Sequence, residues 1–491
     1  MGGNNCSWQE RPGGPCQTAE LDTACVTGHS SVAMVDSGRH RPAGKIPVTI
    51  RLKVPAGMHR AEVFRLVQAR YDAIARLDLD REYGAVPVRP PLARLEEFEK
   101  DRMQLVTLRA FVDPVQLEML REQPYVDRVS RDVPVEPFAR VAPAGFAANR
   151  PPAADRVECA TTDKADGTAA QVARDLGATR LWRAGYTGHG IVVGIVDGGI
   201  TAQNRPIQFG GWPAIPQEPA TGEVVGGWPE ADWGSTAEGW GQHGNMIAFD
   251  VQAMAPEAHL WDIRIWYPEE AFAAYVSRAE AGFRAAIEHY LAHGVPQILV
   301  NAWGLYDSDN GPEYAFDPGS TLALHVEHAL DAGLLIVWAA GNCGDGCAFL
   351  PGSPCGSGDR GPGVSILGPN GHPRVVTVGA ATLRGEWCGY TSQGPAALPP
   401  NDPDKPDFCG VSQFEGFFPN ESGLRPYDGG TSAATGVAGG VVALLKQARP
   451  DLTQEDCKRL LKETARPIGT AAAHGGAGAG MIDALRAFRA M

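Results

Sequence analysis

Residues 191–199 read IVVGIVDGG, a nearly unbroken apolar run that ends in an aspartate followed by two glycines. A continuous apolar run is typical of a strand that is covered on both faces, because a half-exposed strand alternates apolar with polar residues. Helical patterns at 269–292 and 320–332 alternate with four more such runs, which are HLWDIRI (259–265), QILVNAW (297–303), LLIVWAA (334–340) and RVVTVGA (374–380). This alternation predicts an α/β fold with a doubly wound, mostly parallel sheet.

Three short stretches place a reactive residue beside glycines at the edge of an apolar segment. They are IVVGIVDGG with Asp197, GQHGNM with His243 and DGGTSAAT with Ser432. A serine hydroxyl needs an imidazole to take its proton and a carboxylate to orient that imidazole, so these residues could form a catalytic triad. The chain order Asp–His–Ser differs from that of the other common serine hydrolases. Asn342, in WAAGN, adds an amide that could bind the oxyanion together with the Ser432 backbone N–H.

The predicted fold would bring these residues to one edge of the sheet. Binding sites of doubly wound sheets form at the carboxyl ends of the strands, and Asp197, Trp303 and Asn342 fall at such ends. We expect Ser432 to begin the apolar helix 432–447. At a helix N-terminus, unpaired N–H groups and the helix dipole favour a developing negative charge.

These stretches resemble the motifs of the subtilisin-like serine proteases, the subtilases: D-[ST]-G, H-G-T-H, A-A-G-N and G-T-S-M-A-x-P. Further segments resemble the same family, and the likeness covers about residues 175–490; the segments are 251–265, 300–304, 389–395, 405–410 and 478–484. The resemblance implies a serine endopeptidase that acts on polypeptides. It also implies that one group of residues lines the substrate cleft, namely Asn301, Ala302, Trp303, Gly304, Ala339, Ala340 and Gly341. Whether Trp303 narrows the pocket or forms its floor is left open by the sequence.

Three positions depart from the family motifs. Gly198 follows the aspartate where the family has Ser or Thr, Asn245 stands in place of a Thr, and Gly436 stands in place of a Pro. These positions neighbour the reactive groups, so they bear on geometry and rate more than on reaction type. A catalytically silent, protein-binding member of the same fold is therefore the alternative function.

The N-terminal part reads as a separate unit. Residues 1–44 are polar and are expected to be disordered. Residues 45–138 predict a small α+β domain from an alternating strand at 46–54, a helix at 63–74, a strand at 106–112, a short helix at 114–120 and a closing strand at 125–138. The pattern resembles the subtilase propeptide, whose last strand leads into the active-site cleft. An unrelated α+β domain is the alternative.

This resemblance implies that the N-terminal domain is an intramolecular inhibitor and that the enzyme processes itself. Residues 45–138 carry 16 Lys and Arg against 15 Asp and Glu, so docking is expected to depend mainly on shape and backbone pairing. The Ala- and Pro-rich stretch 139–170 reads as an exposed linker that leads to a peptidase domain at 171–491. We therefore expect self-cleavage between about Phe138 and Asp166.

Composition excludes several other functions. The net charge of −14 and the lack of a basic run argue against nucleic acid as a partner. No apolar stretch approaches the roughly 18–20 residues of a membrane span. The first residues lack a secretory pattern, which favours a cytoplasmic protein. We expect a monomer without a cofactor, and the sequence does not decide whether structural calcium is bound.

Three cysteines crowd the loop after Asn342. The spacings between Cys343, Cys347 and Cys355 match no strong zinc pattern, and no fourth ligand is evident nearby. Two of the three could form a disulfide in an oxidising compartment, whereas in a reducing one they would stay thiols. Structural thiols, a disulfide and a metal site all remain open at this stage.

Overall fold

The computed structural model describes residues 44–138, 157–158, 165–201, 222–235, 240, 242–267, 274–346, 354–417, 427–468 and 475–491. The expected disordered head and most of the expected linker lie outside these residues. Among the helices described, none combines the length and the apolar character needed to cross a bilayer.

A five-stranded antiparallel sheet forms the N-terminal domain. Its strands pair in the order β2-β4-β1-β5, with β3 also on β4; they are β1 (Ile46–Pro55), β2 (Asp78–Leu79), β3 (Val86–Val88), β4 (Met103–Val112) and β5 (Val126–Arg131). The helices are α1 (Arg60–Arg70), α2 (Asp72–Ala75), α3 (Leu95–Lys100) and α4 (Pro114–Arg121). Ile50 and Leu52 of β1 pack in a core with Val63 and Val67 of α1. The other face of β1 is also buried, since Thr49 and Arg51 are both 4% exposed. There the Arg51 guanidinium donates to Gly319 O at 2.9 Å.

The main sheet has nine strands and confirms the predicted fold class. Its order is β7-β16-β15-β14-β12-β8-β10-β9, and β17 also pairs with β15. The bounds are β7 (Val157–Glu158), β8 (Val192–Asp197), β9 (Val224–Trp228), β10 (His259–Arg264), β12 (Ile298–Asn301), β14 (Leu335–Ala339), β15 (Val376–Ala381), β16 (Trp387–Cys388) and β17 (Phe408–Val411). Neighbouring strands from β9 to β15 run parallel, whereas β16 is antiparallel to β15.

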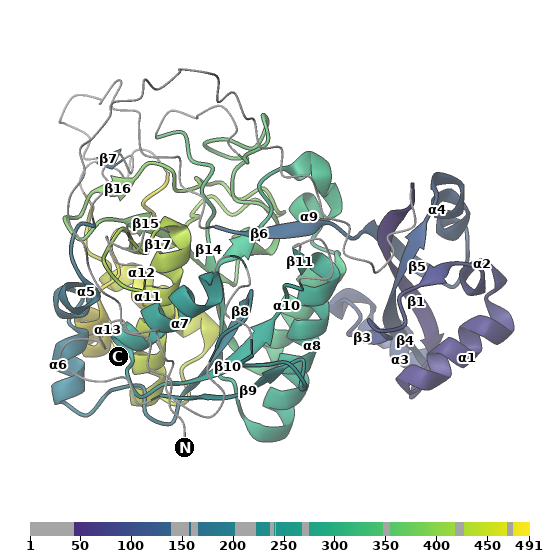
Figure 1. Cartoon of the computed structure of the whole chain (residues 1–491), viewed down its shortest axis with the longest axis horizontal. Coiled ribbons are helices and arrows are strands. Elements are labelled where there is room, and N and C mark those ends of the chain that lie inside the picture. Colours follow the sequence, from purple (N-terminus) through teal and green to yellow (C-terminus); the bar gives the residue numbers. More distant parts are fainter. Residues whose placement is uncertain are drawn as a thin grey trace, which may run out of the picture. The chain divides into compact units, whose positions relative to one another are not determined.

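Helices cover both faces of this sheet (Figure 1). Successive side chains of a strand point to opposite faces, so Val193 of β8 joins one buried cluster and Val192 joins the other. The first cluster includes α7 (His243–Met254) and α11 (Gly430–Ala448), and the second includes α8 (Val276–His293) and α10 (Thr321–Ala332). The other helices are α5 (Ala169–Asp175), α6 (Ala178–Arg183), α9 (Pro312–Phe316), α12 (Gln454–Thr464) and α13 (Ala484–Ala490).

A third, three-stranded sheet joins the N-terminal domain to the part of the chain that contains the main sheet. The expected closing strand divides into β5 and β6 (Pro134–Pro137), and β6 pairs with β11 (Ala274–Tyr275) on one side and with β13 (Trp303–Gly304) on the other. Both pairings are antiparallel. The end of the N-terminal domain is therefore held as the middle strand between two segments from later in the chain.

The expected linker contains regular structure at two places. Its residues Val157–Glu158 form β7, which pairs in parallel with β16 at the edge of the main sheet. Helix α5 begins at Ala169, with Thr168 as its N-cap, so it starts slightly before the expected end of the linker at residue 170. Composition did not indicate these pairings because they depend on partners far along the chain.

Candidate active site

Asp197 and His243 meet at the carboxyl edge of the main sheet. Asp197 is the last residue of β8, and His243 is the first residue of α7. The His243 Nδ1 atom lies 2.9 Å from Asp197 Oδ1 and 2.8 Å from Oδ2, and both side chains are buried. Gly198 N donates to Asp197 Oδ1 at 2.7 Å, which holds the carboxylate in place. This pair fixes the imidazole, whose Nε2 has no hydrogen-bond partner within the described residues.

Ser432 lies in the first turn of α11, which starts two residues earlier than the sequence predicted. The helix begins at Gly430, and Ser432 is its third residue. The Ser432 hydroxyl donates to Ala302 O at 3.0 Å and is not bonded to His243 Nε2. Catalytic hydrogen bonds are often formed only in the reacting complex. A bond from Ser432 to His243 would therefore require the Ser432 side chain to rotate away from Ala302 O.

The Asn342 amide faces a carbonyl oxygen from the N-terminal domain. Asn342 Oδ1 accepts from Thr431 N at 3.0 Å and from Thr431 Oγ1 at 2.9 Å, which identifies the oxygen end of the amide. The opposite end, Nδ2, donates to Phe138 O at 2.6 Å. A Cβ atom on Gly430 would lie 2.2 Å from the same oxygen, so only glycine permits this approach.

The segment that ends at Phe138 lies in the cleft as an extended peptide. Phe138 N donates to Ala302 O at 3.0 Å, and this same oxygen accepts from the Ser432 hydroxyl. The Tyr306 hydroxyl donates to Pro137 O at 3.1 Å. The peptide before the Phe138 carbonyl is thus held on its backbone beside both Ser432 and Asn342.

The structure distributes the residues expected to line the cleft over two locations. Around Phe138, Ala302 provides the backbone acceptor, Ala339 packs in the same buried cluster, and Cβ atoms on Gly304 and Gly341 would lie 2.5 and 3.5 Å from the Phe138 ring.

The other residues of that group face elsewhere. The Asn301 amide donates within the main sheet to Val337 O at 3.4 Å. Ala340 N donates to Val378 O at 2.9 Å. The Trp303 side chain packs on Trp338 in the interior, with ring centroids 4.9 Å apart, so it neither narrows the Phe138 pocket nor forms its floor.

Two of the departures from the family motifs have local partners. Asn245 Oδ1 accepts from Thr201 N at 3.0 Å. A Cβ atom on Gly436 would lie 2.6 Å from Asp250 Cβ, so the absence of a side chain at Gly436 makes room for Asp250 of α7. Burial, followed by the charge of Asp428, raises the pKa of Asp250 well above its usual range. Proline at this place would therefore meet the buried Asp250 side chain.

A second buried carboxyl lies near the Asp197–His243 pair. Asp262 of β10 accepts from Gly234 N at 2.7 Å. Burial raises the pKa of Asp262 to about 7, and the Asp197 charge adds to this rise. The sequence singled out only Asp197, because a lone Asp inside a strand carries no motif.

The cysteine loop contains a disulfide. Cys343 and Cys355 are joined, while Cys347 lies outside the described residues. Within the described ranges, no group of three or more His, Cys, Asp and Glu side chains is arranged to hold a metal ion. The sequence left structural thiols, a disulfide and a metal site open. For Cys343 and Cys355 the structure contains the disulfide.

Comparison with known proteins identifies the family. The model of the subtilase family matches residues 188–480, more than half of the chain. The chain belongs to the subtilase family. Serine-type peptidase is the enzyme class that this membership assigns, and relatives named as proteases agree with it.

The individual relatives are distant from this subtilase. M-protease of Shouchella clausii (strain KSM-K16) is 23% identical over 404 residues, which cover 80% of this chain and 81% of the relative. Subtilisin Savinase of Lederbergia lenta is 25% identical, over 62% of this chain and 93% of the relative. Bacillopeptidase F of Bacillus subtilis (strain 168) is 26% identical over 64% of this chain, and the match spans only 22% of that longer protein.

One solved structure shares the fold over most of this subtilase. It is fervidolysin from Fervidobacterium pennivorans, described as a keratinolytic enzyme related to subtilisin. The TM-score is 0.52 at 17% identity, with 91% of this chain and 61% of fervidolysin covered. At this identity the likeness shows a common fold.

Proposed function

We propose that this subtilase is a self-processing serine endopeptidase whose first substrate is its own Phe138–Ala139 bond. Ser432 is the nucleophile, His243 the general base and Asp197 the group that orients the imidazole. Asn342 and the Ser432 backbone N–H bind the oxyanion. Within the described residues, the Asp197–His243 pair and the bond from Asn342 to Phe138 O favour this function over the catalytically silent alternative.

One observation carries this proposal. The Phe138 carbonyl oxygen accepts from Asn342 Nδ2 at 2.6 Å while Phe138 N is bonded to the oxygen that also holds the Ser432 hydroxyl. A peptide bound in this way is held at the oxygen of the reacting carbonyl and at the amide nitrogen of the same residue. Such positioning lowers the barrier because the reactants need not find one another by diffusion.

The reaction follows from these positions. The Ser432 hydroxyl leaves Ala302 O, transfers its proton to His243 Nε2 and attacks the carbonyl carbon of Phe138. Negative charge develops on the Phe138 oxygen, where Asn342 Nδ2 is already directed. His243 then returns the proton to the nitrogen of Ala139, which leaves as an amine. Water repeats the sequence and releases Phe138 as a carboxylate.

Self-cleavage after Phe138 is the expected result for the wild-type protein. Because the chain itself supplies the peptide, the reaction should be first order, with a rate independent of protein concentration. Intact-mass spectrometry over time at several concentrations measures this and should reveal Ala139 as the new N-terminus. A wild-type chain that stays intact and is fully active would show that the N-terminal domain is a permanent accessory module.

Two matched variants test the pocket for this cut. Phe138→Tyr keeps the ring and should still be processed. Phe138→Asp places a charge where the ring is 3% exposed, so we expect processing to slow by at least about a hundredfold. Equal rates for the two variants would contradict the assignment of Phe138 to the pocket.

Intact-mass spectrometry also reports on the compartment in which the enzyme works. Disulfides persist in oxidising compartments and are opened in a reducing cytoplasm. We therefore propose that the mature enzyme works in an oxidising compartment, which differs from the cytoplasmic location that the sequence favoured. The mass of protein isolated from its native source without reductant reports whether Cys343 and Cys355 are joined.

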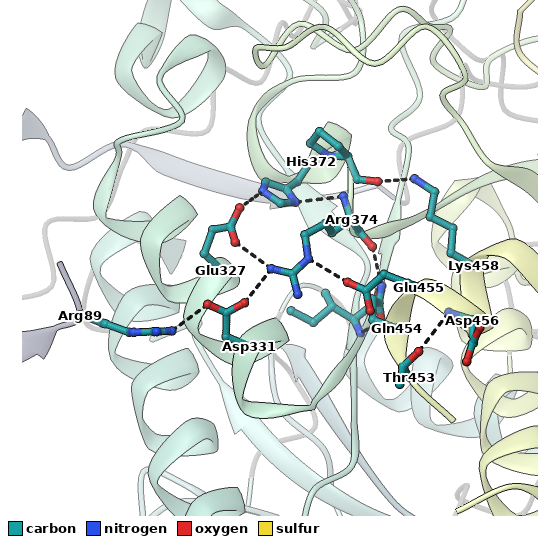
Figure 2. A network of polar contacts seen from close by, with 12 residues as sticks. Arg89, Glu327, Asp331, His372, Arg374, Thr453, Gln454, Glu455, Asp456 and Lys458 are labelled. Atoms are coloured by element: carbon teal, nitrogen blue, oxygen red, sulfur yellow. Dashed lines mark hydrogen bonds and ion pairs between the residues drawn. The ribbon is translucent and has the colours of Figure 1, made fainter. Parts of the chain in front are cut away.

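We further propose that the cleaved N-terminal domain stays docked as an inhibitor, and charged contacts support this. Arg89 at the end of β3 pairs with Asp331 of α10 at 2.8 Å, and Asp331 also binds Arg374 at 2.8 Å (Figure 2). Arg128 of β5 pairs with Asp317. The near-zero net charge of the domain predicted that electrostatic attraction would contribute only modestly to docking. Net charge does not report where charges lie, and these two arginines face carboxylates of the peptidase part.

A buried carboxyl lies at the same interface. The Tyr83 hydroxyl of the N-terminal domain lies 3.3 Å from Glu280 Oε2 of α8. Burial raises the pKa of Glu280 to about 8; the Asp132 charge adds to this rise, whereas the Arg51 guanidinium and the Tyr83 hydrogen bond oppose it. Docking therefore keeps a proton on Glu280 that an exposed glutamate would have lost.

Release of the cleaved domain is expected to increase with pH. An exposed glutamate titrates near pH 4.3, while docked Glu280 titrates near pH 8. The docked state binds more protons between these values, so the contribution to docking is complete below about pH 4 and is lost as the pH rises to about 8. The dissociation constant of the processed complex, measured by size-exclusion chromatography, should rise by at most about tenfold per pH unit.

Glu280→Gln is the matched variant for this titration. Glutamine keeps an oxygen that accepts from the Tyr83 hydroxyl but carries no titratable group. Its complex should show a clearly flatter dependence of the dissociation constant on pH. A variant with the wild-type slope would rule out Glu280 as the source.

A further inference from the structure

A disulfide stands beside the pocket that holds the Phe138 ring. Cys343 directly follows Asn342, and its bond to Cys355 joins Cα atoms 5.8 Å apart. Cys343 and Cys355 are 3% and 5% exposed. They form one buried cluster with Phe138, Tyr306 and Ala339. The disulfide therefore contributes directly to the apolar surroundings of this ring.

Among the described residues, glycine and tyrosine line other sides of the ring. The Tyr306 ring meets Phe138 edge to face, with centroids 5.1 Å apart and planes at 84°. Cβ atoms on Gly304 and Gly341 would approach the Phe138 ring to 2.5 and 3.5 Å. We name the space formed by Gly304, Tyr306, Ala339, Gly341, Cys343 and Cys355 the ring slot. Its glycine sides leave room for a flat group, and its other sides are apolar.

Hydrogen bonds anchor the disulfide on both ends. Cys343 N donates to Ser392 Oγ at 3.0 Å. On the other side, Gly356 N donates to Tyr306 O at 2.9 Å, and Arg360 donates to Cys355 O at 3.1 Å. The bond closes a sequence separation of 12 residues. It therefore ties the segment that begins at Cys355 to the strand end that carries Asn342.

We propose that the Cys343–Cys355 disulfide is a specificity-determining wall of the ring slot, which makes the enzyme select an aromatic residue before the scissile bond. This rests on the proposed function, because it assumes that Phe138 occupies the place of a substrate residue. The wall acts on the side chain of the substrate: with the bond open, Cys355 is no longer covalently fixed to Cys343 beside the slot. An aromatic ring then loses a rigid apolar contact, whereas a methyl group has little to lose.

A competing effect of the same bond makes a different prediction. Cys355 Sγ lies 3.7 Å from Asn342 O, so the disulfide could instead hold the oxyanion donor. Loss of an oxyanion donor slows every substrate equally, because the developing charge is on the backbone. A slot wall affects only substrates that fill the slot. The ratio of kcat/KM between a substrate that fills the slot and one that does not therefore separates the two roles.

The test uses self-processed enzyme and two peptides that match residues 135–138, Val-Glu-Pro-Phe and Val-Glu-Pro-Ala, each followed by the same leaving group. The double variant Cys343→Ser/Cys355→Ser opens the bond, and Cys457→Ser in α12 is the control for loss of a buried thiol elsewhere. We expect kcat/KM for the Phe peptide, relative to the Ala peptide, to fall about tenfold in the double variant, mainly through KM. The control should keep the wild-type ratio.

The ratio is measured on one preparation, so it does not depend on the fraction that folds. If the double variant yields no active enzyme, reduction of the folded wild-type protein by a phosphine opens the same bond, and the ratio should fall and return on reoxidation. An unchanged ratio, or an equal loss for both peptides, overturns the proposal. Labelling by a fluorophosphonate probe reports the nucleophile separately: an enzyme that never labels contradicts the proposed function and not the slot wall.

Discussion

The Ser432→Ala protein is expected to stay full length and to lose peptide hydrolysis, with kcat lower by about 10⁶-fold. The alanine has no oxygen to attack the Phe138 carbonyl, while the contacts that hold residues 134–138 remain. Self-cleavage, peptide hydrolysis and fluorophosphonate labelling should be lost together, because each requires the same hydroxyl. Intact-mass spectrometry, a fluorogenic peptide and the labelling reaction measure these three activities.

Thr435→Val is the matched control in the same helix. The Thr435 hydroxyl donates to Thr431 O at 2.7 Å within α11 and does not face the peptide. This variant should still be processed and labelled. Labelling of the Ser432→Ala protein at a different serine, with hydrolysis retained, would assign the nucleophile elsewhere.

The second large effect is expected from Asn342→Ala. Loss of the amide removes a donor to the developing oxyanion, which should lower kcat by about 10²–10³-fold while KM changes far less. Steady-state kinetics on processed enzyme separate the two parameters. A variant in which only KM changes would contradict the oxyanion role.

Thr431→Val distinguishes the amide itself from its support. The Thr431 hydroxyl donates to Asn342 Oδ1 at 2.9 Å and helps to keep Nδ2 directed at Phe138 O. Without it the amide keeps its bond from Thr431 N, so we expect a smaller loss of kcat than in Asn342→Ala. An equal loss would mean that the amide acts only when the Thr431 hydroxyl orients it, so that the bond from Thr431 N is not sufficient.

Most of the main sheet could be predicted from sequence. The five apolar runs correspond to β8, β10, β12, β14 and β15, because strands covered on both faces need apolar residues at every position. The pattern 320–332 corresponds to α10, one residue shorter at its start. Short edge strands such as β7 and β16 escaped prediction, since two residues carry no periodicity.

The candidate site was predictable only in part. The motifs indicated Asp197, His243, Ser432 and Asn342, since each stands beside glycines at the end of an apolar segment. They did not indicate Thr431, which orients the Asn342 amide, or Tyr306, whose ring and hydroxyl both contact the bound segment. Threonine and tyrosine are common residues with many structural roles, so only their contacts reveal these functions.

The sequence by itself determined the layered α/β fold and the chain order of the reactive residues, because hydrophobic patterning and glycine placement act over a few neighbouring residues. Only the tertiary structure decided that Phe138 faces Asn342, 204 residues away in the chain. It also decided that Cys343 pairs with Cys355, and that the Ser432 hydroxyl is bonded to Ala302. The physical reason is that these contacts depend on where segments that are far apart in the chain meet in space. A local sequence pattern does not specify those meeting points.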